Sequence, residues 1–146
     1  MGQRTQDKSI IAISDFSLGK DTFLLSSFSG SEYLSGLFEF HVEVLSETLD
    51  IAANKIVGKD GTITVQNEHE RTFHGFVRSF SVGEVTSHHL RKYRMALVPW
   101  TWFLTKTRGN RIFQNKSTKD IVSQVCSDLG FNDFEFRGVS GSPREY

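Results

Sequence analysis

Five histidines and one cysteine are the residues of this 146-residue chain best suited to metal or nucleophilic chemistry. Four of the histidines fall within one stretch, at His69, His74, His88 and His89, and His41 lies on an earlier segment. A structural zinc site needs three or four converging ligands, and an adjacent histidine pair with one distant cysteine fits no such spacing. We therefore predict no metal site. His41 and His74 are expected to face solvent or to form hydrogen bonds on strands.

The single cysteine, Cys126, lies beside Val125 in an apolar stripe. A catalytic thiol needs an electropositive and partly exposed setting, so Cys126 is interpreted as a buried core residue. One cysteine cannot form an intramolecular disulfide, so the fold does not depend on an oxidising compartment. The chain also lacks a nucleophile-elbow motif for serine hydrolase chemistry. We predict no catalytic residues and no cofactor.

With metal and catalytic sites disfavoured, a nucleic-acid-binding surface is the strongest remaining candidate site. An aromatic-rich barrel with cationic strands is typical of oligonucleotide-binding folds. The cations concerned are Arg71, Arg78, Arg91, Lys92 and Arg94, and the same region carries Glu43, Glu68, Glu70 and Glu84. Lys plus Arg and Asp plus Glu both number 17, so the net charge is zero and no global field attracts an anionic polymer. A mixed-charge, solvated sheet face is favoured.

The candidate residues are positioned by residues 71–99, which are predicted to form two long strands joined by a polar connection at residues 83–89. The second strand alternates between apolar and cationic side chains, which predicts one buried face and one wet face. The apolar set is Tyr93, Met95 and Leu97, and the cationic set is Lys92 and Arg94.

The first of these two strands changes phase along its length. Its apolar positions are Phe73 and Val77, then Phe76, Phe80 and Val82. A β-bulge, or a strand covered on both faces, would explain the change. Gly75 has no side chain to pack, so the irregularity is predicted there.

Four earlier segments are also predicted to be strands: an edge strand within residues 9–16, and strands at residues 23–28, 37–45 and 62–66. The clearest period-two signal places Phe38, Phe40, Val42 and Val44 on one face and Glu39, His41 and Glu43 on the other. Residues 30–36 form a loop by composition. Consecutive strands without intervening helices predict an antiparallel sheet, and the aromatic content favours a small barrel.

The pattern changes after Pro99. Trp100, Phe103 and Leu104 have helical spacing within residues 100–107, which predicts a short helix or single turn that plugs an open end of the barrel.

Residues 117–129 are predicted to form an amphipathic helix. Ser117 is the expected N-cap, Asp120 takes the place of the capping-box acid, and Gly130 is the expected stop. The apolar stripe is Ile121, Val122, Val125, Cys126 and Leu129. Residues 131–136 follow as a predicted strand.

The length of the chain suits one domain. Residues 1–20 are expected to be a flexible N-terminus with a possible edge strand, its first eight residues being polar and frayed. Residues 21–146 are expected to form the barrel with its helix, as a truncated fragment of a longer protein. The single cysteine, Cys126, fits synthesis and folding in the cytoplasm. No apolar run approaches the roughly 18 residues of a spanning helix and no signal-peptide pattern is present, so export is expected to use a route that does not read an N-terminal signal.

Three segments together resemble the N-terminal, phage baseplate hub-like region of VgrG, the spike protein family of the bacterial type VI secretion system. They are SGSEYLSGLFEFHVEVLSE at residues 29–47, FHGFV at 73–77, and YRMALVPWTWFLTKTRGNRIFQNKSTKDIVSQVCSDLG at 93–130. The closing Pro-Arg-Glu-Tyr at residues 143–146 is also similar to the family. The resemblance covers about residues 20–146.

The resemblance implies a mainly β fold with some α, a hub-like small antiparallel barrel with a plug helix and one amphipathic helix. It implies a structural component of the secretion spike that joins the tube of hexameric Hcp rings to the cell-puncturing needle for effector delivery. The implied partners are the Hcp ring, the other subunits of a homotrimer, and a downstream needle, tip protein or effector. It implies assembly in the cytoplasm and secretion through the type VI apparatus without a signal peptide.

The resemblance carries over no catalytic, cofactor or metal residues, so the residues singled out are structural. They are Phe38, Phe40, Phe73, Gly75, Tyr93, Leu97, Pro99, Trp100, Ile112, Phe113, Ile121 and Val125. The alternatives are the baseplate hub of a contractile phage tail and, less favoured, a nucleic-acid-binding barrel.

Overall fold

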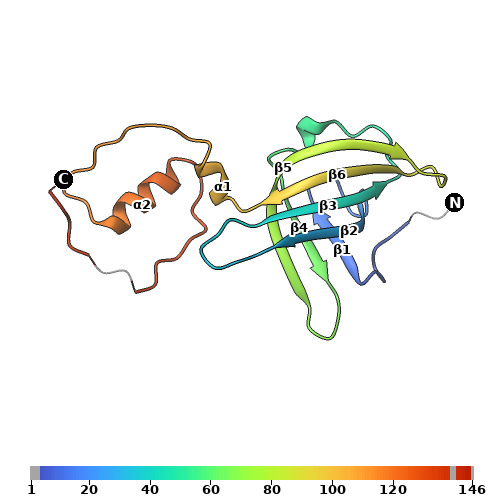
Figure 1. The fold of residues 1–146 in the computed structure, drawn as a ribbon, viewed down its shortest axis with the longest axis horizontal. Helices are drawn as coiled ribbons and strands as arrows, with labels where there is room; N and C mark the ends of the chain where they lie inside the picture. The colour runs from blue at the N-terminus through green and yellow to red at the C-terminus, as the bar shows by residue number, and fades with distance from the viewer. Residues whose placement is uncertain (1–3, 139–140, 146) are drawn as a thin grey trace. The chain divides into compact units, whose positions relative to one another are not determined.

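Six antiparallel strands make up the first part of the computed structural model, which describes residues 4–138 and 141–145 (Figure 1). Hydrogen-bonded neighbours follow the order β1-β4-β5-β6-β3-β2, and β1 approaches β2, so the sheet nearly closes into a barrel. The strands are β1 (Ile11–Asp15), β2 (Leu24–Ser31), β3 (Glu39–Ser46), β4 (Asp60–Val65), β5 (Arg71–Val85) and β6 (Arg91–Val98). A short 3₁₀ turn, η1 (Ala53–Lys55), lies between β3 and β4. The predicted small antiparallel barrel is confirmed.

Packing divides the chain into two compact units, one ending at Leu104 and the other beginning at Thr105. This division differs from the single body expected for residues 21–146. Residue 20 marks no boundary either, because β1 pairs with β4 and belongs to the barrel. Each unit is described by itself below.

The barrel core consists of the inward-facing side chains of the strands. In β6, Tyr93, Met95 and Leu97 are buried as their alternation predicts, and Met95 stands opposite Val42 of β3. The hydroxyl of Tyr93 donates a hydrogen bond to the Thr48 carbonyl at 2.9 Å and accepts one from the Ile51 amide at 3.2 Å, so its burial leaves no polar group unpaired. Burial of each large apolar side chain contributes about 1.5 to 3 kcal/mol.

The irregularity in β5 lies at Arg78, not at Gly75. The register with β6 shifts between Val77 and Ser79, and again between Val82 and Val85. The extra residue reverses the side-chain alternation, which explains why Val77 and then Phe80 both pack toward the core. The strand also continues to Val85, so the connection predicted at residues 83–89 begins three residues later than expected, after β5 ends.

Gly75 has a packing role that differs from the prediction. A Cβ added there would lie 3.0 Å from the Val98 carbonyl oxygen, and 3.3 Å from Leu97 Cβ and Phe38 Cε2. The missing side chain therefore allows β5 to pass closely over β6 and Phe38.

The helix α1 (Thr101–Leu104) is a single turn. The ring of Phe103 lies 5.8 Å from Phe76, and Arg78 lies 5.8 Å above the ring of Trp102. Phe76 alternates with the buried Gly75 and Val77, so it faces outward from β5. These contacts place α1 against the outward-facing side of β5, and its filling of an open end of the barrel stays a prediction.

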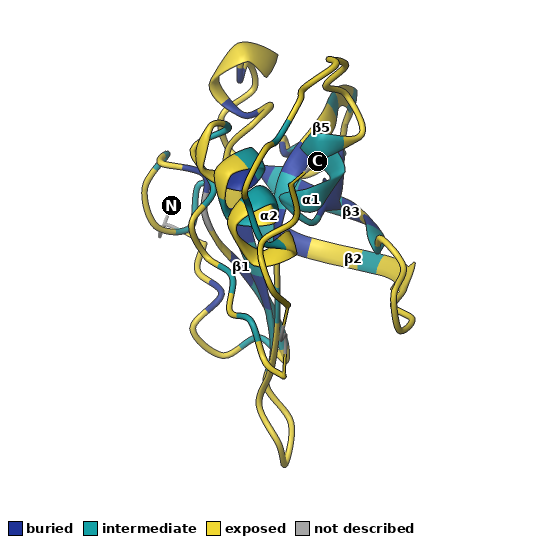
Figure 2. Cartoon of the chain, turned by 90° about the vertical axis from the view of Figure 1, so that its left-hand side faces the viewer, coloured by how far each residue is buried: buried dark blue, intermediate teal, exposed yellow. Residues whose placement is uncertain are grey.

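The second unit contains α2 (Thr118–Ser127), which confirms the predicted helix. The Ser117 hydroxyl accepts a hydrogen bond from the Asp120 amide, and the Asp120 carboxylate accepts one from the Ser117 amide, completing the capping box. Gly130 adopts a φ of +81°, which suits glycine at a helix end. Cys126 is buried and Val122 is exposed, and Figure 2 shows this mixed burial of the helix.

Two predictions for the second unit are wrong. Residues 131–136 form no strand, because none of them pairs with a neighbouring strand, and an isolated bridge joins Lys116 to Arg144 instead. Ile112 is 88% exposed, because its segment forms neither helix nor strand and does not enclose it. Among the described residues, no helix is long and apolar enough to cross a membrane.

The other residues expected in the core are placed as follows. Phe40, Gly75, Tyr93 and Leu97 are buried, and Phe38, Phe73, Pro99, Trp100, Phe113, Ile121 and Val125 are partly buried.

Candidate functional site

One end of the barrel carries a cluster of aromatic rings, and we call this end the mouth. It is the end where residues 32–38 connect β2 to β3 and residues 66–70 connect β4 to β5. The ring of Phe73 lies 5.6 Å from Phe28 and 5.0 Å from Phe40, and Phe40 lies 5.0 Å from Phe38. These tilted and edge-on geometries are favourable for aromatic pairs. Side chains from three different strands and one loop therefore pack into an apolar surface at the mouth, which we call the aromatic floor.

Glycine makes room for this cluster. Gly30 of β2 stands opposite Phe40, and a Cβ at Gly30 would lie 2.4 Å from the Phe40 ring. The Arg71 guanidinium lies 4.5 Å above the ring of Phe73 and donates a 2.7 Å hydrogen bond to Glu32. Arg71 thus joins β5 to the β2–β3 loop across the mouth.

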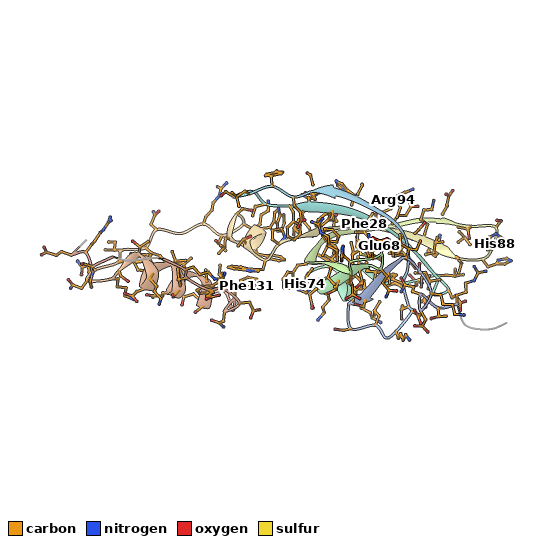
Figure 3. All side chains as sticks on the ribbon, turned by 90° about the horizontal axis from the view of Figure 1, so that it is seen from below. Phe28, Glu68, His74, His88, Arg94 and Phe131 are labelled. Carbon is orange, nitrogen blue, oxygen red and sulfur yellow. The ribbon has the colours of Figure 1, made fainter. Side chains whose placement is uncertain are left out.

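A cleft of about 770 Å³ opens beside the aromatic cluster. Phe28, Val65 and Phe73 supply its apolar lining, and Glu68 and Glu70 belong to its polar part. Phe28 and Glu68 are labelled in Figure 3. An apolar floor with a few polar groups can hold a side chain or an extended segment of a partner.

The cations that could contact nucleic acid are held by other groups of the barrel. Arg94 pairs with Glu43 at 3.1 Å, Arg78 pairs with Glu39 at 2.8 Å, and Lys92 lies 3.4 Å from Glu43 and 3.5 Å from Glu84. Arg91 donates hydrogen bonds to the Leu49 and Gly83 carbonyls. These pairs favour the mixed-charge sheet face over a phosphate-binding surface.

The histidines lie apart from one another. His74 is exposed and shares a 3.1 Å hydrogen bond with Thr62, and His41 is exposed at 3.7 Å from Glu39, as expected for both residues. Figure 3 shows His74 and His88 at well-separated places on the barrel. Within residues 4–138 and 141–145, no group of three or more His, Cys, Asp or Glu residues is placed to hold a metal ion.

Gln6 closes the barrel, and sequence reasoning missed it. Its side-chain nitrogen donates hydrogen bonds to the carbonyls of Ile13 at 3.1 Å and Phe23 at 2.8 Å. Its side-chain oxygen accepts hydrogen bonds from the amides of Ile13 at 3.0 Å and Leu25 at 2.9 Å. One carboxamide thus satisfies backbone groups of β1, of β2 and of Phe23 just before β2, where no ladder joins the two strands. The prediction of a frayed N-terminus is wrong for Gln6; residues 1–3 lie outside the described part.

An ion pair lies next to this contact. Lys20 Nζ is 2.8 Å from Asp7 Oδ1, and the hydrogen bond from Lys20 holds the pKa of Asp7 below its usual value. The same contact raises the pKa of Lys20. Both side chains are exposed, so the pair ties the N-terminal segment to the β1–β2 connection only weakly.

Comparisons with known proteins agree with the barrel. The family model described as phage tail baseplate hub (GPD) matches residues 31–146. The chain is 37% identical over 134 residues to the type VI secretion system spike protein VgrG1b of Pseudomonas aeruginosa, covering 90% of this chain and 18% of that protein. It is 37% identical over 124 residues to VgrG1a of the same organism, covering 83% of this chain and 19% of that protein. The chain therefore spans about a fifth of the length of these relatives.

A more distant relative and one solved structure extend the comparison. The protein named actin cross-linking toxin VgrG1 of Vibrio cholerae is 28% identical over 130 residues, which cover 82% of this chain and 12% of that protein. The solved structure is the E. coli c3393 protein, described as a type VI secretion component structurally similar to the T4 bacteriophage tail proteins gp27 and gp5. It matches with a TM-score of 0.67 and 24% identity, over 92% of this chain and 37% of that chain. This last likeness shows the fold.

Proposed function

The chain belongs to the phage tail baseplate hub (GPD) family, and from this premise we propose that it forms the first barrel and the adjoining helical unit of a type VI secretion spike. The observation that carries the proposal is the 37% identity over 134 residues to a spike protein of this system. In this role the barrel joins the tube of hexameric Hcp rings to the needle that punctures the target cell, and so serves effector delivery.

The proposed role is structural. The mouth of the barrel contains aromatic rings and one paired arginine, and these groups hold shape without performing a reaction. The partners in this proposal are the Hcp ring, two further copies of the spike subunit, and a downstream needle with its tip protein or effector. The spike assembles in the cytoplasm and leaves the cell through the secretion apparatus without a signal peptide.

A chimera tests the proposal. The matched residues of this chain replace the corresponding region of P. aeruginosa VgrG1b in a strain without its own spike genes, and release of Hcp into the medium is measured. The chimera should form a trimer by light scattering and restore Hcp release. A control chimera with Val44→Asp, which places a carboxylate at a position with no solvent exposure, should fail to fold its barrel and should restore nothing. A folded, trimeric chimera that releases no Hcp would refute the proposal.

The baseplate hub of a contractile phage tail is the second candidate, favoured by the description of the matching family model. The neighbouring genes distinguish the two, because genes for Hcp and a contractile sheath accompany a secretion spike and capsid genes accompany a phage hub.

A further inference from the structure

The loop between β2 and β3 exposes apolar side chains at the mouth of the barrel. Leu34 is 99% exposed and Tyr33 is 64% exposed, and Leu37 of the same loop is also exposed. Residues 31–37 are exposed without interruption, which Figure 2 shows for the segment beyond β2. A single exposed leucine is ordinary, but several on one projecting loop mark a contact surface.

The turn that carries Leu34 is held in one shape. The Gly36 amide donates a hydrogen bond to the Tyr33 carbonyl at 3.3 Å, and Ser35 adopts a φ of +60°. The Tyr33 ring lies against Gly36 so closely that a Cβ there would be 1.9 Å from Tyr33 Cε2. A preformed turn loses little conformational freedom when it binds, so the exposed leucine is ready for docking.

The base of the loop is linked to the cleft of the mouth. The 2.7 Å contact between Arg71 and Glu32 joins them, because Arg71 lines the cleft and Glu32 begins the loop. Glu68 and Glu70 on the cleft rim have no ion pair with any residue in the described part of the chain. The surface therefore offers one projecting apolar side chain, an aromatic floor and two free negative charges.

The charges and the exposed apolar groups of this surface restrict which class of partner can bind it. The two rim carboxylates repel phosphates, which disfavours nucleic acid and anionic lipid. The outer-face cations of a second copy, such as Arg78 and Arg94, are already held by glutamates and would have to give up those pairs. A different protein with an apolar socket and unpaired lysine or arginine side chains fits the surface.

We propose that the Leu34 loop and the neighbouring cleft are the surface by which this barrel docks onto the ring protein Hcp. Leu34 enters an apolar socket of the ring, and Glu68 and Glu70 face cationic side chains beside that socket. This inference rests on the proposed function, because it names the part of the barrel that meets the ring.

An NMR titration locates the contact on the chain itself. The ¹⁵N-labelled 146-residue chain is titrated with purified P. aeruginosa Hcp rings up to millimolar concentration, at which weak contacts are detected. Amide signals of residues 32–37 and 66–71 should shift or broaden first. Leu34→Ser should weaken the binding at least about tenfold, because it removes the burial of a leucine side chain. Its melting temperature should equal that of the native chain, since Leu34 is 99% exposed.

Two matched controls separate this surface from others. Ile112→Ser removes another highly exposed apolar side chain from the second unit and should leave the affinity unchanged. Replacing Glu68 and Glu70 by glutamine should reduce the dependence of binding on salt, because two charges leave the interface. Glu47 is exposed just after β3, at the other end of the barrel, so Glu47→Gln should leave the salt dependence of binding unchanged.

Three results would overturn the inference. The first is no change at residues 32–37 and 66–71 at the highest ring concentration, or changes confined to other residues. The second is an equal loss of affinity with Leu34→Ser and Ile112→Ser. The third is a shift of the loop signals with chain concentration alone, which would make a second copy the occupant. The spike proposal is tested separately, by Hcp release from the chimera. If the chimera with Leu34→Asp releases as much Hcp as the chimera without it, the docking surface is refuted and the proposed spike role stands.

Discussion

Removal of the Gln6 carboxamide should open the barrel between β1 and β2. Gln6→Ala deletes hydrogen bonds to the backbone of Ile13, Phe23 and Leu25, and it leaves two amides and two carbonyls without this partner. Gln6 is only 9% exposed, so water reaches these groups poorly in the folded chain. The substitution also removes a carboxamide that bridges the two ends of the strand order by hydrogen bonds.

The size of the effect follows from the unpaired groups. A buried donor or acceptor without a partner costs about 1 to 3 kcal/mol, and partial entry of water lowers the sum for four of them to about 3 to 5 kcal/mol. Typical domains are stable by only about 5 to 15 kcal/mol, so the barrel should lose a large part of its stability. For a unit of this size the melting temperature should fall by at least about 10 °C.

Thermal and urea denaturation of the whole chain measure this loss, with Gln66→Ala as the matched control. Gln66 is exposed, and its backbone amide donates a 2.7 Å hydrogen bond to the Ile10 carbonyl, which alanine retains. The control should change the free energy of unfolding by less than about 0.5 kcal/mol. Equal melting temperatures for the two alanine variants would refute the role of Gln6.

A conservative variant tests the chemistry of the same contact. Gln6→Glu keeps the shape, but a carboxylate has no hydrogen to donate to the carbonyls of Ile13 and Phe23. The variant should therefore be strongly destabilised at neutral pH. Protonation supplies one donor, so its deficit relative to the native chain should shrink as the pH is lowered, and a deficit independent of pH would contradict the hydrogen-bonding role.

Three further expectations follow from the structure. Gly75→Ala should destabilise the barrel by about 1 to 3 kcal/mol, because its Cβ would press on the Val98 carbonyl; Gly109→Ala, where nothing lies within 4 Å of an added Cβ, should not, and denaturation of both variants decides the point. The hydrogen bonds from Ser117 hold the pKa of Asp120 below its usual value. A lowered folded-state pKa stabilises α2 above the ordinary aspartate range, and this contribution is lost as the pH falls through the folded pKa. Ser117→Ala removes the hydroxyl and keeps the backbone amide, so it should reduce that pH dependence of helicity measured by circular dichroism. The chain should not change the electrophoretic mobility of single-stranded oligonucleotides at about 150 mM salt. A micromolar complex that weakens steeply with salt would favour the nucleic-acid-binding barrel.

Local patterns in the sequence were sufficient for much of the fold. The alternation predicts the buried apolar positions of β3 and the burial of Tyr93, Met95 and Leu97 in β6, because it depends only on the two-residue period of a strand. It does not predict the burial of Ala96 and Val98 on the opposite face of β6. The capping box at Ser117 and the stop at Gly130 involve groups within one turn of each other, so they are visible in a short segment. The motifs of residues 29–47 and 93–130 led to the family, which the match over residues 31–146 confirms.

Local patterns were insufficient where a partner distant in sequence decides the outcome. The segment 131–136 has strand-like composition but finds no neighbouring strand, and a strand needs one to satisfy its backbone. The bulge lies at Arg78 because the register between β5 and β6 places it there, and nothing in the composition of β5 points to Arg78.

Gln6 shows most clearly what the sequence by itself determined and what only the tertiary structure decided. The sequence predicted β2 as a strand of an antiparallel, aromatic-rich barrel and β1 as an edge strand in the N-terminal segment. It could not determine how the barrel closes, because the partners of Gln6 lie between 7 and 19 residues away and come together only when the sheet has curled. A glutamine in a polar N-terminal segment has no local signal of burial, and its role arises from four backbone groups that the folded barrel leaves facing one gap.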